Sequence, residues 1–318
     1  EARKMLWGPD VSSEDEAKIK VVEGAEGIGE ILEDAEGLII SGAGFAGLSS
    51  AYCETVLRNA PECKSVAICV EAGKNADAVE AARVQPNIGF TVTSRDQQSL
   101  WADRGCPDLE VIPNGIDTDR WVPAGEPGDY LTWVGRIVPD KGLAEAIQAA
   151  RKARARLKIF GPVEDAAYFA AKVEPFLDGG IEFHGHRSAE HLRQEVAQAR
   201  GALVTPLWDE PFGLVAAEAL SCGTPVAGFD RGALSEVVGD CGILVKGGDV
   251  GALAHAIRRL GSIDRAACRE RATSTLSIGA MIAGYERCYA KVIAGARLAS
   301  LPRLAWASSS SSTTELLA

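Results

Sequence analysis

The sequence lacks a long hydrophobic run. No stretch approaches the roughly 20 apolar residues that a membrane-spanning helix needs, and the first residues are polar and acidic, unlike those of a signal peptide. We therefore expect a cytoplasmic protein without a stable membrane anchor. The chain opens with Glu1 in place of Met, which leaves room for an upstream segment.

Paired cysteines and basic residues are also scarce. The eight cysteines are scattered and form no C-x-x-C pair, so we expect buried free thiols and no metal or redox centre. The net charge is −11, and the first 60 residues hold 12 acidic against 5 basic side chains. Such a surface repels phosphate-rich partners, so nucleic acid and anionic lipid are disfavoured.

Apolar runs alternate with helical patterns, which is typical of parallel α/β sheets. We predict a first set of strands at residues 37–42, 65–71, 88–93 and 109–112, with helices at 45–59, 75–84 and 94–104. After a break at 113–129, strands follow at 130–134, 156–160, 181–184, 201–205, 225–228 and 242–245, with helices at 142–154, 188–199, 213–221, 249–260, 264–274 and 278–295. This predicts two Rossmann-like domains that face a cleft, residues 1–122 and 123–300, and a disordered Ser-rich tail at 301–318.

The stretch IISGAGFAGLSSA contains a G-x-G-x-x-G run at Gly42, Gly44 and Gly47, after an apolar run and before a predicted helix. Glu71 lies where a dinucleotide fold places its ribose-binding carboxylate. One interpretation is an FAD- or NAD-binding oxidoreductase. The other is a tight turn whose amide groups form a phosphate loop.

The stretch DEPFGLVAAEALSCGTPV, residues 209–226, carries two glutamates eight positions apart, Glu210 and Glu218. Between them a loop leads into a helix, and a helix N-terminus offers unpaired N–H groups to a diphosphate. We predict that this segment binds a nucleotide through Pro211, Phe212, Gly213, Leu214 and Val215 together with the two glutamates.

The stretch WVGRIVPDKG, residues 133–142, follows a predicted strand with Gly135, Arg136 and Lys141. Residues directly after a parallel strand face the crevice at the edge of the sheet. Two cations that converge there can neutralise a diphosphate leaving group.

These segments, with VTSRDQQSL, IPNGID, RGALSEVV and GYERCY, resemble the retaining glycosyltransferases of family four, which have the GT-B fold. The resemblance implies a hexosyltransferase that needs no metal or cofactor and uses a UDP-, GDP- or ADP-sugar as donor. It assigns the diphosphate to Arg136 and Lys141, the ribose to Glu218 and the transferred sugar to Glu210. Transfer with retention is then expected, with the leaving phosphate taking the acceptor proton, so the catalytic residues are Arg136, Lys141 and Glu210.

Three features of the N-terminal half differ from the family pattern. The expected N-terminal domain is unusually short and has no Gly-Gly loop, and Ser41 to Gly44 stand where many members have a histidine. A non-catalytic nucleotide-sugar-binding protein is therefore an alternative. Asp117-Thr118-Asp119 resembles a D-x-D metal motif but falls in the predicted hinge, so we expect no metal there. The acidic N-terminal charge predicts a soluble acceptor, neutral or cationic, such as a small metabolite or a sugar.

Overall fold

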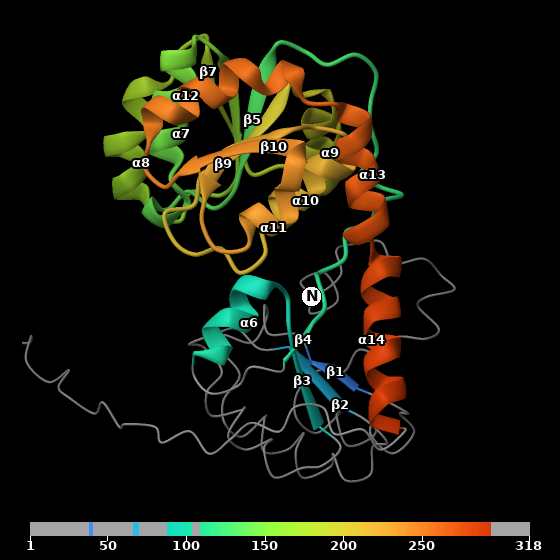
Figure 1. Ribbon diagram of the computed structural model, residues 1–318. Coiled ribbons are helices and arrows are strands. Elements are labelled where there is room, and N and C mark those ends of the chain that lie inside the picture. The colour runs from blue at the N-terminus through green and yellow to red at the C-terminus, as the bar shows by residue number, and fades with distance from the viewer. Residues whose placement is uncertain (1–37, 41–65, 70–87, 104–108, 294–318) are drawn as a thin grey trace, which may run out of the picture.

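This computed structural model describes residues 38–40, 66–69, 88–103 and 109–293. In these residues the chain forms two parallel sheets together with helices (Figure 1). The glycine-rich run 42–47, the predicted helices at 45–59 and 75–84, and the tail 301–318 lie outside the described residues. Predictions about those segments stay predictions.

The first sheet has four parallel strands in the order β1 (Leu38–Ile40), β2 (Val66–Cys69), β3 (Ile88–Val92) and β4 (Glu110–Val111). Helix α6 (Arg95–Ala102) joins β3 to β4. Ser94 begins this helix with extended backbone, and its hydroxyl accepts a hydrogen bond from the Gln97 amide at 3.2 Å. That is ordinary N-cap chemistry, and it explains why the chain turns from strand to helix here.

The second sheet has six parallel strands in the order β10-β9-β8-β5-β6-β7. Their bounds are β5 (Tyr130–Val134), β6 (Arg156–Phe160), β7 (Ile181–Gly185), β8 (Gly201–Val204), β9 (Val226–Asp230) and β10 (Gly242–Lys246). The chain builds outward from β5 in one direction and then, starting at β8, in the other. Such a reversal leaves a crevice beyond the carboxyl ends of the two strands. The crevice between β5 and β8 is therefore where this domain should hold a ligand.

Helices cover both faces of the second sheet. They are α7 (Leu143–Ala153), α8 (Ala166–Lys172), α9 (Ala189–Gln198), α10 (Leu214–Ser221), α11 (Leu234–Val238), α12 (Val250–Arg259) and α13 (Arg265–Thr275). In α7 the fully buried residues Leu143, Ala146, Ile147 and Ala150 recur at helical spacing and pack with α12 in one core. A second core lies under α10, α11 and α13. Of these helices, α8 and α11 are short and were not predicted.

Helix α14 (Ile278–Ile293) leaves the second domain and returns to the first sheet (Figure 1). Tyr285 and Cys288 pack with Ile112 in a small buried cluster. The Lys291 ammonium also pairs with the Glu110 carboxylate at 2.8 Å. The predicted division at residue 122 placed this helix in the second domain, whereas its side chains belong to the core of the first. A helical pattern shows that one face is buried, not which sheet buries it.

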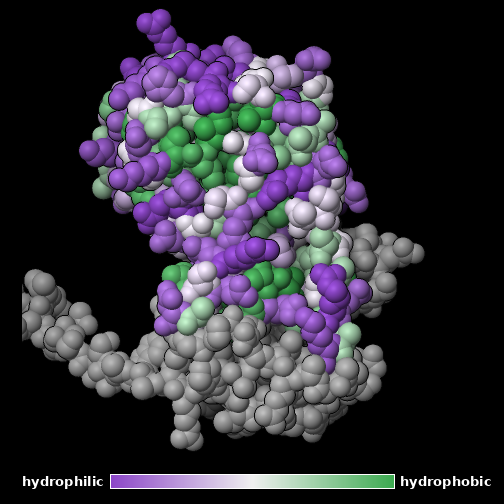
Figure 2. All heavy atoms as spheres, in the orientation of Figure 1, coloured by the Kyte–Doolittle hydropathy of each residue, from purple (hydrophilic) through white to green (hydrophobic). Residues whose placement is uncertain are grey.

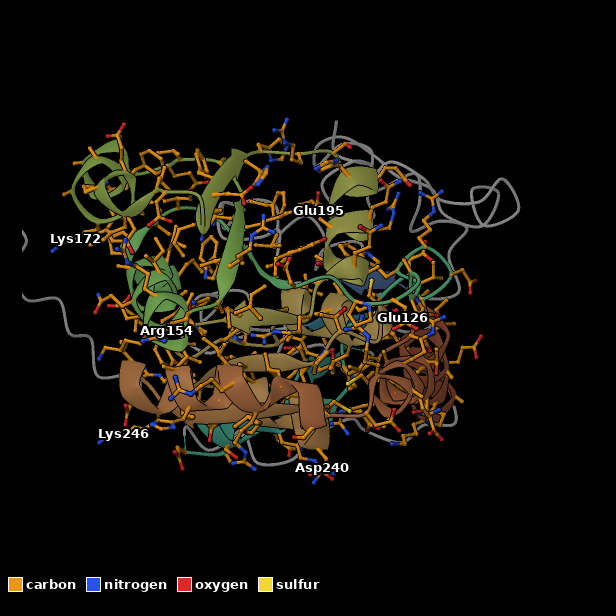
Figure 3. All side chains as sticks on the ribbon, turned by 90° about the horizontal axis from the view of Figure 1, so that it is seen from above. Glu126, Arg154, Lys172, Glu195, Asp240 and Lys246 are labelled. Carbon is orange, nitrogen blue, oxygen red and sulfur yellow. The ribbon has the colours of Figure 1, made fainter. Side chains whose placement is uncertain are left out.

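The face of the second domain seen in Figure 2 is hydrophilic around its edge. Hydrophilic residues surround it in Figure 2, and hydrophobic ones gather near its middle, where Figure 1 shows the strands. Charged side chains such as Lys172, Asp240 and Lys246 lie at its periphery in the view from above (Figure 3). Within the described ranges, no helix combines the length and the apolarity required to cross a bilayer.

Candidate functional site

The loop after β5 is held close to the loop after β8 by a glycine. Gly142 has φ 65°, and a Cβ added to it would lie 1.9 Å from the Thr205 carbonyl oxygen. Thr205 is buried, and its hydroxyl donates to the Gly142 carbonyl at 2.9 Å and accepts from the Trp133 indole at 3.0 Å. The two loops therefore form one rigid rim at the crevice.

Lys141 and Glu210, predicted on separate loops, meet at this rim. The Lys141 ammonium donates to a Glu210 carboxylate oxygen at 3.0 Å, and both side chains are about one-fifth exposed, at 21% and 18%. The same ammonium lies 4.8 Å from the ring centroid of Trp208, within range of a cation–π contact. The structure thus brings a mostly buried cation and a mostly buried carboxylate together in the crevice.

Arg136 is placed differently. Its guanidinium donates to Glu164 at 3.0 Å, and both side chains are largely exposed, at 54% and 43%. The backbone carbonyl of Asp140, in the same loop, accepts from the Leu207 amide at 2.8 Å. The Arg136 side chain is long and largely exposed, so breaking this ion pair costs little free energy.

Helix α10 begins at the same crevice. Gly213 starts it with φ 94°, where a Cβ would lie 2.5 Å from a Leu234 methyl group. Phe212 is buried and anchors the loop, whereas Leu214 is 46% exposed. The described hydrogen bonds of the first turn begin with the Ala216 amide, so the amides before it are available to an anion.

Glu218 lies about one turn after the start of α10. It is partly accessible but closely surrounded by protein, and burial raises the pKa of its carboxyl to about 8. The guanidinium of Arg193 acts in the opposite direction, because a nearby cation favours the charged form. Arg193 had no role in the sequence prediction.

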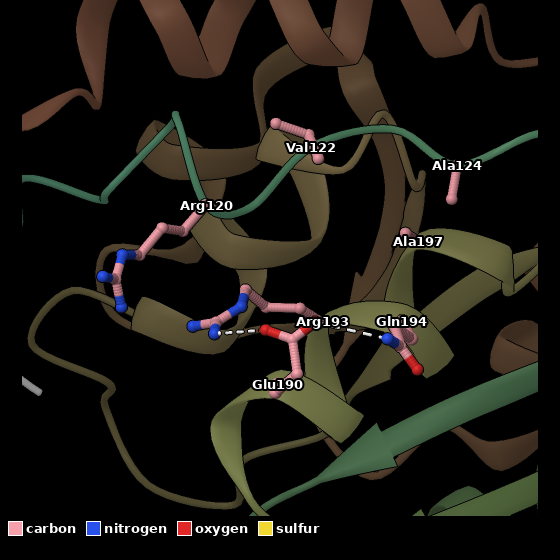
Figure 4. Close-up of a pocket in the computed structure, with 7 residues that line it drawn as sticks. All are labelled: Arg120, Val122, Ala124, Glu190, Arg193, Gln194 and Ala197. Atoms are coloured by element: carbon pink, nitrogen blue, oxygen red, sulfur yellow. Dashed lines mark hydrogen bonds and ion pairs between the residues drawn. The ribbon is translucent and has the colours of Figure 1, made fainter. Parts of the chain in front are cut away.

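Arg193 also lines a pocket of about 310 Å³ between α9 and the connection to β5 (Figure 4). Arg120, Glu190 and Gln194 supply its other polar groups. Arg193 donates to Glu190 at 2.8 Å. In the preceding connection, the Asp117 carboxylate accepts from the amides of the two residues at 119 and 120, each at 3.2 Å, as a turn-forming aspartate does.

The first domain touches the loop that carries Glu210. The Thr93 hydroxyl donates to the Pro211 carbonyl at 3.1 Å. The first two amides of α6, those of Arg95 and Asp96, donate to the two Glu236 carboxylate oxygens at 2.8 and 2.7 Å.

The α6 contact also crowds acidic groups together. The pKa of the Asp96 carboxyl is raised by burial and then by the nearby Asp209 and Glu236 charges. Helix α11, which carries Glu236, is in turn tied to the site, because the Ala233 amide donates to the Glu210 carbonyl at 2.8 Å.

The structure therefore joins some of the predicted site residues and leaves others apart. It gathers Lys141, Glu210 and the start of α10, and it leaves Arg136 paired at the surface. The predicted phosphate loop at Gly42, Gly44 and Gly47 lies outside the described residues. Thr93 and Glu236, which had no predicted role, lie in the segments VTSRDQQSL and RGALSEVV. The resemblance of these segments to the family was the signal that could have identified the two residues.

Comparison with protein families gives this geometry a context. Residues 128–262, which include both crevice loops, match the sequence profile of the family "Glycosyl transferases group 1". This segment is therefore similar to a group 1 glycosyltransferase domain. It holds Lys141 and Glu210, which meet at the crevice, and Glu218 in α10.

Curated relatives match a similar share of the chain. Alpha-maltose-1-phosphate synthase of Mycolicibacterium smegmatis is 30% identical over 158 residues, which cover 42% of this chain and 41% of the relative. The match thus spans about two-fifths of the relative's length.

Solved structures match most of the chain. AviGT4, a glycosyltransferase involved in avilamycin A biosynthesis, has a TM-score of 0.71 at 24% identity and covers 91% of this chain and 83% of its own. The Anabaena protein HepE, solved in complex with UDP, has a TM-score of 0.67 at 16% identity and covers 83% of this chain and 82% of its own. The fold is GT-B, as predicted, with two α/β domains.

Proposed function

We propose that this protein is a retaining glycosyltransferase that moves a hexose from a nucleotide-diphospho-sugar to a soluble acceptor. One observation carries the proposal. Lys141 and Glu210 pair at 3.0 Å at the crevice between β5 and β8, next to the free amides at the start of α10. A cation, a carboxylate and helix N-terminal amides at one point match the charges and hydroxyls of a sugar diphosphate.

In this proposal the cations stabilise the leaving diphosphate. Lys141 turns from Glu210 to the phosphate oxygens, and Arg136 leaves the exposed Glu164 to join it. The amides that open α10 contribute further donors. Charge stabilisation of a leaving phosphate is the main catalytic device available to such a site, and these protein cations supply it without a metal or a cofactor.

The two glutamates hold the neutral parts of the donor. Glu210 accepts from hydroxyls of the hexose once Lys141 has turned to the phosphates, and Glu218 accepts from the vicinal hydroxyls of the ribose. Retention follows if the acceptor attacks from the side of the leaving phosphate, which takes the acceptor proton. The bond to the diphosphate oxygen breaks as the bond to the acceptor oxygen forms.

The comparisons support a nucleotide-linked donor. HepE, which shares the fold, was solved with UDP. The relative from Mycolicibacterium smegmatis is named alpha-maltose-1-phosphate synthase. For the acceptor, the acidic first 60 residues argue against anionic lipid and nucleic acid, because their phosphates would be repelled. Liposome co-sedimentation and a DNA shift assay at low salt should therefore show no binding, and strong salt-sensitive binding in either would contradict this part of the proposal.

The decisive experiment is a donor panel. UDP-, GDP- and ADP-linked hexoses are incubated with the purified protein, with and without a mixture of sugars and small metabolites, and nucleoside diphosphate release is measured. We expect release from at least one donor, and the anomeric coupling constant of the product should show retention by proton NMR. Tight binding of a donor without turnover would instead favour a nucleotide-sugar-binding protein.

A further inference from the structure

Trp208 is a crevice residue that had no predicted role. It follows β8, in the loop that carries Glu210, and the Lys141 ammonium lies over its ring, 4.8 Å from the centroid. The same ammonium donates to a Glu210 carboxylate oxygen at 3.0 Å. The face of the Trp208 ring and the Glu210 carboxylate therefore converge on one point, and an ammonium group occupies that point.

The backbone on either side of this point is held in place. The Leu207 amide donates to the Asp140 carbonyl at 2.8 Å, and the Thr205 hydroxyl donates to the Gly142 carbonyl at 2.9 Å. Trp208 itself is partly exposed and its indole nitrogen is buried, so the accessible part of its side chain is carbon. The crevice therefore presents apolar ring surface beside a carboxylate.

A second trio of the same kind shows what a purely structural arrangement looks like. The Lys158 ammonium pairs with Glu195 at 2.7 Å and lies 3.8 Å from the centroid of the Tyr130 ring. Tyr130 begins β5, at the end of the sheet opposite the crevice, and is only 7% exposed. A ligand cannot reach that ring. Trp208 differs in both respects, because it lies beyond the carboxyl end of β8 and is partly exposed.

A hexose has the groups to take the place of the ammonium. Its hydroxyls donate to a carboxylate, and the C–H groups on one side of its ring carry small positive charges that the negative face of an aromatic ring attracts. In this structure Lys141 covers the Trp208 face. The face becomes available to the hexose when the ammonium turns to the diphosphate, so binding of the two parts of the donor is coupled.

We propose that Trp208 is the platform on which the transferred hexose stacks while Glu210 accepts hydrogen bonds from its hydroxyls. The proposal rests on the proposed function, because it takes Lys141 to bind the diphosphate and Glu210 to bind the hexose. A hydroxyl that projects from the stacked side of the sugar would separate it from the ring. Trp208 therefore contributes to the choice between hexoses that differ at one carbon.

The test compares each nucleoside diphosphate with a sugar-linked form by calorimetry, without acceptor: UDP with UDP-glucose, GDP with GDP-mannose and ADP with ADP-glucose. The ratio of the two affinities isolates the part of binding that depends on the hexose. In Trp208→Leu this ratio should fall on the order of tenfold, the effect of leaving about 50 Å² of apolar surface exposed. Affinity for the free diphosphate should stay the same or rise, because the ring no longer competes for the Lys141 ammonium. Trp208→Phe keeps an aromatic face and should retain most of the wild-type ratio.

A control variant and a second measurement accompany this comparison. Leu207→Ala removes a side chain that is 39% exposed on the same loop but has no ring, so the ratio should remain that of the wild type. Saturation-transfer difference NMR, with irradiation of the aromatic protons, reports the contact directly. Hexose C–H protons of the bound donor should receive saturation in the wild type, and this signal should fall relative to that of the base protons in Trp208→Leu. The wild-type spectrum decides the question even if Trp208→Leu does not fold.

The outcomes separate the two proposals. If the wild-type protein binds none of these nucleotides or sugar nucleotides, the proposed function is wrong and this inference is lost with it. If it binds one, but its hexose protons receive no saturation or the affinity ratio is unchanged in Trp208→Leu, only the role of Trp208 is wrong. Equal losses of affinity for the free and the sugar-linked nucleotide in Trp208→Leu would also overturn it, because they indicate a structural role. A lower ratio in Trp208→Leu, retained in Trp208→Phe and Leu207→Ala, with hexose saturation in the wild type, would establish it.

Discussion

Two cations that follow the same strand, Lys141 and Arg136, have different surroundings, and their replacement should have different effects. Lys141→Ala removes a charge-assisted contact worth about 1.5 to 3 kcal/mol, so nucleoside diphosphate affinity should fall roughly 10- to 150-fold. The effect of Arg136→Ala should lie at the lower end of that range, because the Arg136 side chain is 54% exposed and water screens its contacts. Calorimetry measures both, and Glu164→Gln is the control that should leave affinity unchanged or higher. Unchanged affinity in both alanine variants would show that Arg136 and Lys141 do not bind the diphosphate.

The two glutamates should separate binding from transfer. Glu218→Ala should weaken binding of the free nucleoside diphosphate, because the ribose belongs to the nucleotide. Glu210→Ala should leave that binding intact and lower sugar transfer by at least about tenfold, since it removes a contact to the hexose only. Affinity by calorimetry and steady-state rates with the donor found in the panel give the comparison. Equal losses of nucleotide affinity in the two folded variants would show that the roles are wrongly assigned.

At the scale of elements, the rim of the crevice depends on the close approach of two loops at Gly142. Gly142→Ala would place a methyl group 1.9 Å from the Thr205 carbonyl, at a backbone conformation with φ 65° that alanine rarely adopts. We expect a loss of at least about 2 kcal/mol in the free energy of unfolding and weaker nucleotide binding, because Lys141 is the adjacent residue. Urea unfolding followed by circular dichroism, with calorimetry for affinity, measures both.

Replacing two other glycines separates the two causes of that loss, the left-handed backbone and the steric overlap with a neighbouring carbonyl. Gly125 has φ 43° with nothing within 4 Å of an added Cβ, so Gly125→Ala measures the conformational cost alone, about 1 kcal/mol. Gly261 has neither a left-handed backbone nor a close neighbour, so Gly261→Ala should change stability by no more than about 0.5 kcal/mol. Equal effects of the replacements at 125 and 142 would mean that the loops can separate without cost.

For the whole molecule, the contact between Glu236 and the start of α6 links the two domains. Helix-start amides bound to a carboxylate combine charge-assisted hydrogen bonds with the favourable end of the helix dipole. The same α11 is bonded to the loop of Glu210 through Ala233. The orientation of the first domain is thereby coupled to the position of the loop that carries Glu210.

Glu236→Ala should loosen this link without damaging the nucleotide site. The amides of Arg95 and Asp96 should exchange with deuterium roughly 10- to 150-fold faster, matching the loss of about 1.5 to 3 kcal/mol. Nucleotide affinity should change less than twofold, while the rate of transfer to the acceptor should fall. Glu270→Ala is the matched control, because Glu270 is an exposed glutamate of α13 that takes no part in the contact with α6. Unchanged exchange at α6 in Glu236→Ala would show that the contact does not hold the domains.

Local pattern determined much of this protein. The alternation of apolar runs located the six strands of the second sheet, β5 and β6 to the residue, because buried parallel strands need continuous apolar residues. The spacing of Lys141 after β5 and of Glu210 after β8 also indicated the crevice. In a parallel sheet the carboxyl ends of all strands lie at one edge, so residues that follow strands are neighbours even when they are distant in the chain.

Tertiary structure alone decided which side chains those residues meet. The partner of Arg136 is Glu164, the partner of the start of α6 is Glu236, and α14 returns to the first sheet, and all of these are contacts between segments that are not adjacent in sequence. Periodicity reports that a face is buried, and residue type reports a charge, but neither names the partner. The partner depends on how helices pack on the two sheets and on how the two domains meet.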